Sequence, residues 1–294
     1  MKPNVECVLD IKAKLGECPV WCARSSNLYW IDIQAPSLNR FDPSTGDNRA
    51  WLLREPIGSF ALCETEDEAL LALKSGLHRF NLASGTLTPV AAPEPELPDN
   101  RLNDGRCDRQ GRFWVGSMRD PPVPGAPTGS LYRCDASERC TAMVGGLYVA
   151  NGLAFSPDGR ILYHSDSFPA VRSIWRADVD IASGALTNRR LFVDTHGMPG
   201  RPDGGAVDAD GCYWSAATDG WELVRFTPAG KVDRRIPLPV AKPSMLAFGG
   251  GRLDTIYVTS IRPANADLSK QPLAGSLFAI AAGVQGLPEP LFAG

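Results

Sequence analysis

The 294-residue sequence lacks several features that would place it in a common class of protein. It has no block of basic residues and a formal net charge of −3, so nucleic acid is not an expected partner. No apolar run approaches the ~18 residues that cross a bilayer, so no membrane partner is expected. The first residues carry Glu6 and Asp10 and lack the apolar core of a secretory signal. We therefore predict a cytoplasmic location.

Metal and redox motifs built on cysteine or histidine are also missing. No Cys-x-x-Cys pair occurs among the eight cysteines, and Cys18 and Cys22 lack the second half of a zinc motif. In a long chain without a signal, most cysteines are expected to be buried thiols. Cys134 and Cys140 flank a predicted hairpin that would bring them near each other. The three histidines share no position in the repeat described next, so a histidine-based zinc centre is not expected.

The sequence does contain one motif six times: an apolar, aromatic-rich strand, a turn and a second strand. The third positions of the first strands are 30, 71, 114, 163, 214 and 257, at intervals of 41, 43, 49, 51 and 43 residues. This period is the length of one four-stranded propeller blade, which buries both faces only against its neighbours. We predict an all-β fold, a six-bladed β-propeller of four-stranded antiparallel blades, with residues 1–294 as a single domain. The strand at 6–11 is expected to pair with residues 290–292 and close the ring.

A short apolar strand precedes each repeated pair, and its start can be aligned by the apolar residue four places on. The aligned positions are Glu17, Ser59, Asn103, Asn151, Asp203 and Ser244. The innermost strands of a propeller line its central channel, so equivalent strand ends converge near the axis. Four oxygen-rich side chains are thereby predicted to surround one site: Glu17, Asn103, Asn151 and Asp203. Taken singly, Asn151 and Asp203 also read as turn residues, since each is followed by glycine.

Carboxylate and carboxamide oxygens favour one divalent cation, Ca²⁺, Mg²⁺ or Mn²⁺, with Zn²⁺ as a further option. Arg101 lies two residues before Asn103, so strand alternation puts both side chains on one face. There Arg101 either holds a substrate hydroxyl, stabilises an oxyanion or forms a rim ion pair. Asp120 begins a proline-rich loop and either reaches over the channel mouth to bind substrate or is a solvated loop carboxylate. The irregular stretches 91–100, 119–129 and 194–202 are either rim walls and lids or plain surface connections.

These residues lie in motifs that together resemble the gluconolactonase / senescence marker protein / luciferin-regenerating enzyme family. The resemblance extends from about residue 15 to residue 262 and covers residues 15–21 (LGECPVW), 29–33 (YWIDI), 101–105 (RLNDG), 111–118 (GRFWVGSM), 151–159 (NGLAFSPDG), 201–204 (RPDG) and 253–260 (LDTIYVTS). It implies a six-bladed propeller that binds one divalent cation and hydrolyses sugar lactones.

By the same resemblance, Glu17, Asn151 and Asp203 are metal ligands, and Asp203 is also the base. Arg101 and Asn103 would contact substrate or complete the site. Cys18 departs from the family, which usually has glycine there, and a thiol beside a ligand would crowd the metal or alter its preference.

A mechanism follows from these residue types. The metal polarises the lactone carbonyl, Asp203 deprotonates a water that attacks the carbonyl carbon, and the metal and Arg101 stabilise the oxyanion. Ring opening then yields the hydroxy acid. An equally compatible route keeps Asp203 as a ligand only and leaves activation of the water to the metal.

The leading functional hypothesis is therefore metal-dependent hydrolysis of an aldonolactone to the aldonic acid. The alternatives are a calcium-dependent, phosphotriesterase-like hydrolase and a non-catalytic binding scaffold. A scaffold predicts no polar convergence at the axis. The expected partner is a small sugar lactone, and the expected state is a monomer or a weak homo-oligomer.

Overall fold

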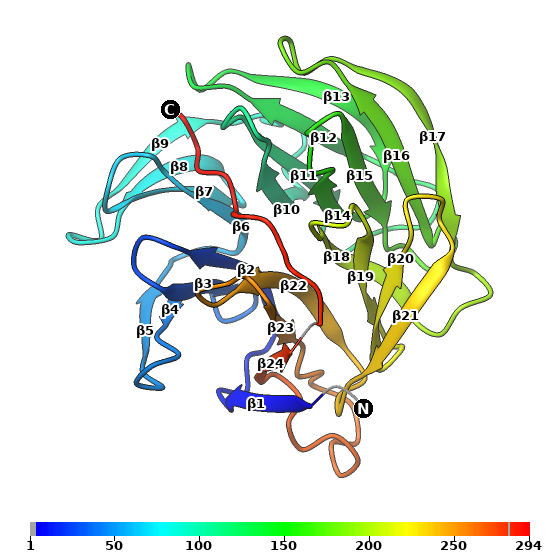
Figure 1. Ribbon diagram of the computed structural model, residues 1–294. Coiled ribbons are helices and arrows are strands. Elements are labelled where there is room, and N and C mark those ends of the chain that lie inside the picture. Colours follow the sequence, from blue (N-terminus) through cyan, green and yellow to red (C-terminus); the bar gives the residue numbers. More distant parts are fainter. Residues whose placement is uncertain (1–3, 282) are drawn as a thin grey trace.

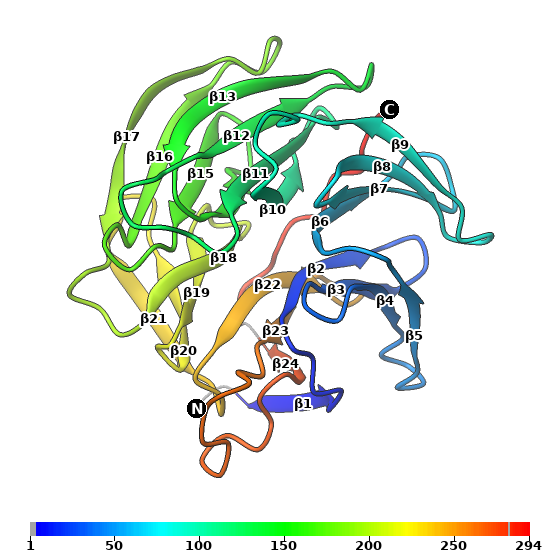
Figure 2. The same ribbon diagram turned by 180° about the vertical axis from the view of Figure 1, so that it is seen from behind.

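Six four-stranded antiparallel sheets stand in a ring around a central axis (Figures 1 and 2). The computed structural model describes residues 4–281 and 283–294. Over these ranges no helix is long and apolar enough to cross a bilayer. The predicted all-β, six-bladed propeller of four-stranded antiparallel blades is confirmed.

Each blade begins with a strand next to the axis and continues outward (Figure 1). The first three blades consist of β2 (Gly16–Cys22), β3 (Asn27–Asp32), β4 (Ser37–Phe41) and β5 (Asn48–Leu52); β6 (Ile57–Leu62), β7 (Glu68–Leu73), β8 (Gly76–Asn81) and β9 (Leu87–Ala91); and β10 (Asn100–Cys107), β11 (Phe113–Arg119), β12 (Gly129–Cys134) and β13 (Cys140–Leu147). The next two consist of β14 (Ala150–Phe155), β15 (Ile161–Asp166), β16 (Ser173–Val179) and β17 (Leu186–Asp194), and of β18 (Arg201–Val207), β19 (Tyr213–Thr218), β20 (Glu222–Phe226) and β21 (Val232–Pro237). The sixth consists of β22 (Pro243–Gly249), β23 (Thr255–Ser260), β24 (Leu277–Ala281) and β1 (Val5–Leu9).

The repeated aromatic position packs one blade against the next. Trp114 is fully buried and meets Phe155 of the following inner strand at 5.7 Å between ring centroids. Trp214 meets Phe248 in the same way at 6.2 Å. Because each ring fills the gap between two sheets, the 41- to 51-residue spacing in the sequence becomes the angular spacing of the blades.

The sixth blade closes the ring, but not through the expected pairing. The N-terminal strand β1 pairs antiparallel with β24, with Val5 opposite Ile280. The prediction that residues 290–292 supply its partner is wrong. Phe292 instead bridges Cys63 of the second blade. Residues 277–281 are the better partner because they continue the hairpin that begins with β23.

The C-terminal segment 283–294 runs across the ring on one face (Figure 1). Its backbone forms hydrogen bonds with turns that follow the inner strands, among them Ala293 N to Gly111 O at 3.0 Å and Ala209 N to Gln285 O at 2.8 Å. Glu289 forms an ion pair with Arg106 of β10 at 3.2 Å. The segment therefore covers the end of the axis where the inner strands finish.

Cysteine chemistry follows the expectation for a chain with a large core. Cys134 and Cys140 face each other across the β12–β13 hairpin and form a disulfide. Five of the other cysteines are buried thiols and Cys7 is half-buried.

Candidate active site

Four of the aligned side chains meet in one pocket at the end of the axis where the inner strands begin. The pocket has a volume of about 200 Å³ and is lined by Glu17, Asn103, Asn151 and Asp203, together with Arg101. These residues come from four different inner strands, β2, β10, β14 and β18. The predicted convergence at one point is thus what the structure shows. Asp120 does not line this pocket, but it is bonded to a residue that does.

A β-bulge in each inner strand aims these side chains at the axis. The pairing register shifts between Glu17 and Val20, between Leu102 and Gly105, and at the corresponding point of the other blades. A bulge bends the strand and redirects one side chain away from the regular alternation. In the first blade the bulge holds Cys18 at a φ of 46°, a left-handed conformation that favours glycine.

The pKa of each of the two carboxylates in the pocket, the half-buried Glu17 and the buried Asp203, is raised. Burial raises the pKa of Glu17 well above its usual range, and the negative charges of Asp203 and Asp104 raise it further. Burial raises the pKa of Asp203 to about 7, against the opposing effect of Arg201. Among the described residues neither Glu17 nor Asp203 forms an ion pair. Two neighbouring carboxylates with raised pKa values and no ion-pair partner favour the binding of a positive ion.

A chain of hydrogen bonds fixes the two carboxamides. Asn103 Nδ2 donates to Asn151 Oδ1 at 2.9 Å, and Asn151 Nδ2 donates to Ser167 Oγ at 2.7 Å. Ser167 Oγ in turn donates to the Pro202 carbonyl at 2.6 Å. Asn103 Oδ1 accepts from Arg101 Nη1 at 2.6 Å, so its oxygen is already in use. Asn103 therefore orients Asn151, which lines the pocket and whose amide oxygen, with two lone pairs, can bind a cation while it accepts this hydrogen bond.

Arg101 is held from two sides. It is 7% exposed, and its Nε donates to Asp120 Oδ2 at 2.6 Å. The side chain of Asp120 is 46% exposed. Asp120 thus reaches back from the proline-rich loop to the channel mouth, and its neighbour Pro122 lines the pocket.

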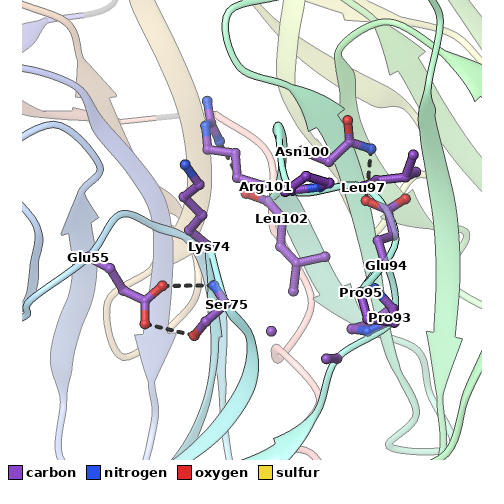
Figure 3. Close-up of a pocket in the computed structure, with 13 residues that line it drawn as sticks. Glu55, Lys74, Ser75, Pro93, Glu94, Pro95, Leu97, Asn100, Arg101 and Leu102 are labelled. Carbon is purple, nitrogen blue, oxygen red and sulfur yellow. Dashed lines mark hydrogen bonds between the residues drawn. The ribbon is translucent and has the colours of Figure 1, made fainter.

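A second, larger pocket of about 320 Å³ lies beside the site and shares Arg101 with it (Figure 3). The loop from Ala92 to Pro98 forms one of its walls. Glu94 anchors that loop, since its carboxylate accepts hydrogen bonds from Asn100 Nδ2 at 2.9 Å and Ser117 Oγ at 2.6 Å. This irregular stretch is therefore a rim wall.

The donor set fits a divalent cation with oxygen ligands. Glu17, Asp203 and the Asn151 oxygen supply two charges and one neutral donor, a combination suited to hard cations. The described residues contain no cluster of three His, Cys, Asp or Glu side chains, so a thiolate or imidazole centre is not built here. The Cys18 thiol packs away from the pocket, 3.9 Å from the Phe60 carbonyl oxygen.

Several residues of the site were not singled out from the sequence. Arg201, Thr218 and Lys242 also line the pocket. Asp104 lies behind it, 5% exposed, and burial raises its pKa to about 6. A signal for two of them was present: Arg201 and Lys242 each stand two residues before an aligned position, as Arg101 does.

We expect Asp203→Asn to stabilise the metal-free protein at about pH 8. Because the folded pKa of about 7 exceeds the usual 3.8, the folded state keeps a proton that the unfolded chain has released. This contribution to the free energy of unfolding is complete below about pH 4 and is lost as pH rises through about 7. The asparagine variant has no charge to bury at position 203, so its stability does not fall over this pH range. Urea unfolding with a chelator should show the gain at about pH 8 and a smaller one at about pH 5. An equal difference at both pH values would contradict the assigned cause.

The chain is similar to known proteins over its whole length. A model of the SMP-30/Gluconolactonase/LRE-like region matches residues 15–262. A 6-deoxy-6-sulfogluconolactonase of Pseudomonas putida is 42% identical, with 100% of both chains covered. An L-arabinolactonase of Azospirillum brasilense is 38% identical over 97% of this chain and 94% of the relative. Regucalcin of Xenopus laevis is 32% identical over 99% of each chain.

Solved structures of similar proteins share the whole fold. A calcium-binding protein, regucalcin, from Agrobacterium tumefaciens superimposes with a TM-score of 0.94 at 27% identity, over 99% of this chain and 98% of that one. A luciferin-regenerating enzyme gives a TM-score of 0.92 at 25% identity, over 99% of each chain.

Proposed function

The chain belongs to the SMP-30/gluconolactonase/LRE-like family, and from this premise we propose that it opens the ring of an aldonolactone to give the aldonic acid, with the help of one divalent cation. Lactone hydrolysis is the activity for which the two bacterial relatives are named, and this chain is a hydrolase of that kind. The choice of an aldonolactone and the need for a cation are the proposed parts.

One observation carries the proposal: two carboxylates, the half-buried Glu17 and the buried Asp203, share a pocket with the fixed amide oxygen of Asn151. The pocket volume of about 200 Å³ suits a single sugar ring better than a large ligand. The polar lining also argues against a non-catalytic scaffold, which predicts no such convergence.

Glu17, Asn151 and Asp203 would hold the cation, which when bound would supply polarisation of the lactone carbonyl. The chain's own groups would do the rest. Asp203 would accept a proton from the attacking water at a carboxylate oxygen. Arg101 directs its guanidinium at the substrate oxygens, held in place by Asp120.

Neighbouring side chains keep this arrangement in place. Asn103 and Ser167 fix the orientation of the Asn151 amide, so its oxygen needs no rearrangement during the reaction. The apolar residues Leu15, Val149 and Ile261 line the same pocket and exclude water from the rest of the substrate.

A panel of lactones tests the proposal. We expect proton release on mixing the protein with pentono- or hexonolactones, loss of that release after chelation, and recovery on adding back Ca²⁺, Mn²⁺, Mg²⁺ or Zn²⁺. The panel should include lactones with and without a sulfo group, because the names of the two bacterial relatives differ in that substituent. Hydrolysis that survives complete removal of metal would overturn the proposed cation dependence.

We expect Arg101→Ala to impair turnover more than folding. The side chain is buried beside the pocket, whereas its partner Asp120 is half-exposed and can be hydrated when the arginine is lost. Loss of a charged hydrogen bond to substrate should lower kcat/KM about 10- to 100-fold. Arg119→Ala is the matched control, because that arginine forms an exposed pair with Asp99. A large fall in melting temperature with normal specific activity of the folded fraction would show that Arg101 is structural.

A further inference from the structure

One side of the pocket mouth carries more positive charge than the reaction described above requires. Arg201 begins β18 and Lys242 directly precedes β22, so the two cations come from adjacent blades. Each stands two residues before an aligned position, Asp203 or Ser244, and alternation along the strand therefore turns it toward the axis. Both line the pocket together with Glu17.

The two cations share a single carboxylate. Asp219 accepts a hydrogen bond from Arg201 Nη2 at 2.8 Å and lies 2.5 Å from Lys242 Nζ. The side chains of Arg201 and Lys242 remain 28% and 24% exposed. Arg101 across the mouth has Asp120 as its own partner. With Glu17 and Asp203 assigned to the proposed cation, the fifth- and sixth-blade side of the mouth has two cations, Arg201 and Lys242, and one further carboxylate, Asp219, among the described residues.

A buried hydroxyl without a partner lies in the same place. Thr218 is opposite Arg201 in the β18–β19 pairing and is 3% exposed. Thr218 lines the pocket, and its Oγ1 is covered by neighbouring atoms and has no hydrogen-bond partner among the described residues. A buried hydroxyl left unpaired costs free energy, so its position is explained if a ligand atom completes it.

The turn that carries Asp219 is strained. Asp219 and Trp221 have φ values of 67° and 62°, a left-handed conformation that is unfavourable for residues other than glycine. Such strain persists where the surrounding structure requires it, often at ligand sites. Here it places the Asp219 carboxylate between the two cations, which keeps both side chains at the mouth when no ligand is present.

The blades on either side of the fifth and sixth carry apolar residues at the same position. Leu15 and Val149 stand two residues before Glu17 and Asn151, where the fifth and sixth blades carry cations. A lactone bound here would turn a charged substituent toward Arg201 and Lys242, because the remaining cation of the pocket, Arg101 of the third blade, is paired with Asp120. Its carbonyl would face Glu17 and Asp203 on the axis, and its far end would face the cations.

We infer that Arg201, Lys242 and Thr218 form a subsite for a tetrahedral oxyanion, a sulfonate or a phosphate, carried on the lactone at the carbon remote from the carbonyl. This inference rests on the proposed lactonase function. Two cationic groups and a hydroxyl donor offer the hydrogen bonds that such a group accepts, and the planar guanidinium suits two of its oxygens at once. The subsite makes the enzyme selective for anionic lactones.

The test is a ratio of specificity constants. We would measure kcat/KM of the metal-loaded protein for gluconolactone, its 6-deoxy-6-sulfo derivative and its 6-phospho derivative. For the wild type we expect kcat/KM for at least one of the two anionic lactones to exceed kcat/KM for gluconolactone. Lys242→Met and Thr218→Val should each lower that ratio, Lys242→Met by about 10- to 100-fold. The anionic lactone with the higher ratio identifies the group that the subsite takes.

The ratio of kcat/KM for an anionic lactone to that for the neutral lactone distinguishes binding of the charged substituent from an indirect effect on Asp203. Arg201 and Lys242 also affect the pKa of Asp203, but such an effect changes turnover of all three lactones alike. Lys231→Met is the matched control, since it removes an exposed lysine from the turn between β20 and β21, at the end of the fifth blade away from the pocket. Hydrolysis of the neutral lactone with a ratio near one, or a ratio that neither variant lowers, overturns the subsite alone. No hydrolysis of any lactone overturns the proposed function.

Discussion

Asp203→Asn should abolish most lactone hydrolysis while sparing much of the metal affinity. Asparagine still offers an oxygen to a cation, yet it cannot accept a proton. Loss of a general base typically costs about 10²- to 10⁴-fold in rate. The rest of the pocket should persist, because Asn103, Asn151 and Ser167 form their hydrogen bonds without the Asp203 side chain. Metal binding by calorimetry and turnover at saturating metal measure the two effects separately.

Two outcomes would contradict this assignment of Asp203. Near-normal turnover with normal metal binding would mean that the water is activated without it. A joint loss of affinity and rate, with the rate restored by excess metal, would make Asp203 a ligand only. Asp47→Asn is the control, because that carboxylate is exposed and lies in a turn of the first blade.

Glu17→Gln should weaken divalent cation binding more than any other single change at the site. Among the described residues, Glu17 and Asp203 are the two carboxylates that line the pocket, and this substitution removes one of them. Losing an outer partner of a metal ligand costs about 10- to 100-fold in affinity, so loss of a charged ligand should cost at least about 100-fold. Turnover should fall with affinity and recover in part at high metal concentration.

The same substitution should leave the metal-free protein folded. Glutamine has nearly the same shape, and it removes a carboxylate whose pKa is raised by burial and by the charge of Asp203. The melting temperature with a chelator should therefore be equal to or higher than that of the wild type at about neutral pH. Glu66→Gln, an exposed change in the second blade, is the control. Unchanged metal affinity would show that Glu17 is not a ligand.

The fold could be predicted because its signal is periodic. Residues such as Trp114 and Trp214 recur at blade spacing since each must fill the same gap between sheets. The alignment of inner strands then brought Glu17 and Asp203 together across most of the chain length. The repeat along the whole chain thus predicts which side chains meet at the propeller axis, and no short segment predicts this by itself.

Other features depend on contacts that have no period. The pairing of β1 with β24 depends on which late segment extends a hairpin, and the sequence offered Phe292 as an apolar competitor. The bond between Arg101 and Asp120 depends on the path of a loop with four prolines. The unpaired state of the Thr218 hydroxyl becomes visible only when every neighbour is known. Cytoplasmic location, the single-domain organisation and the monomeric or weakly associated state stay predictions.

The C-terminal segment closes one end of the central channel, so the channel is open only at the end that holds the candidate active site. Leu287 and Pro290 pack beside Arg106 and Phe248 around a space of only about 20 Å³, at the end away from Glu17 and Asp203. A sugar acid formed at the site then has one exit, which is the entrance used by the next lactone. Product and substrate would exclude each other in the channel, and accumulated acid should raise the apparent KM without lowering the maximal rate. Because ring opening adds one negative charge to those that the lactone already carries, release of the acid past the cationic mouth would be slower than entry of the lactone.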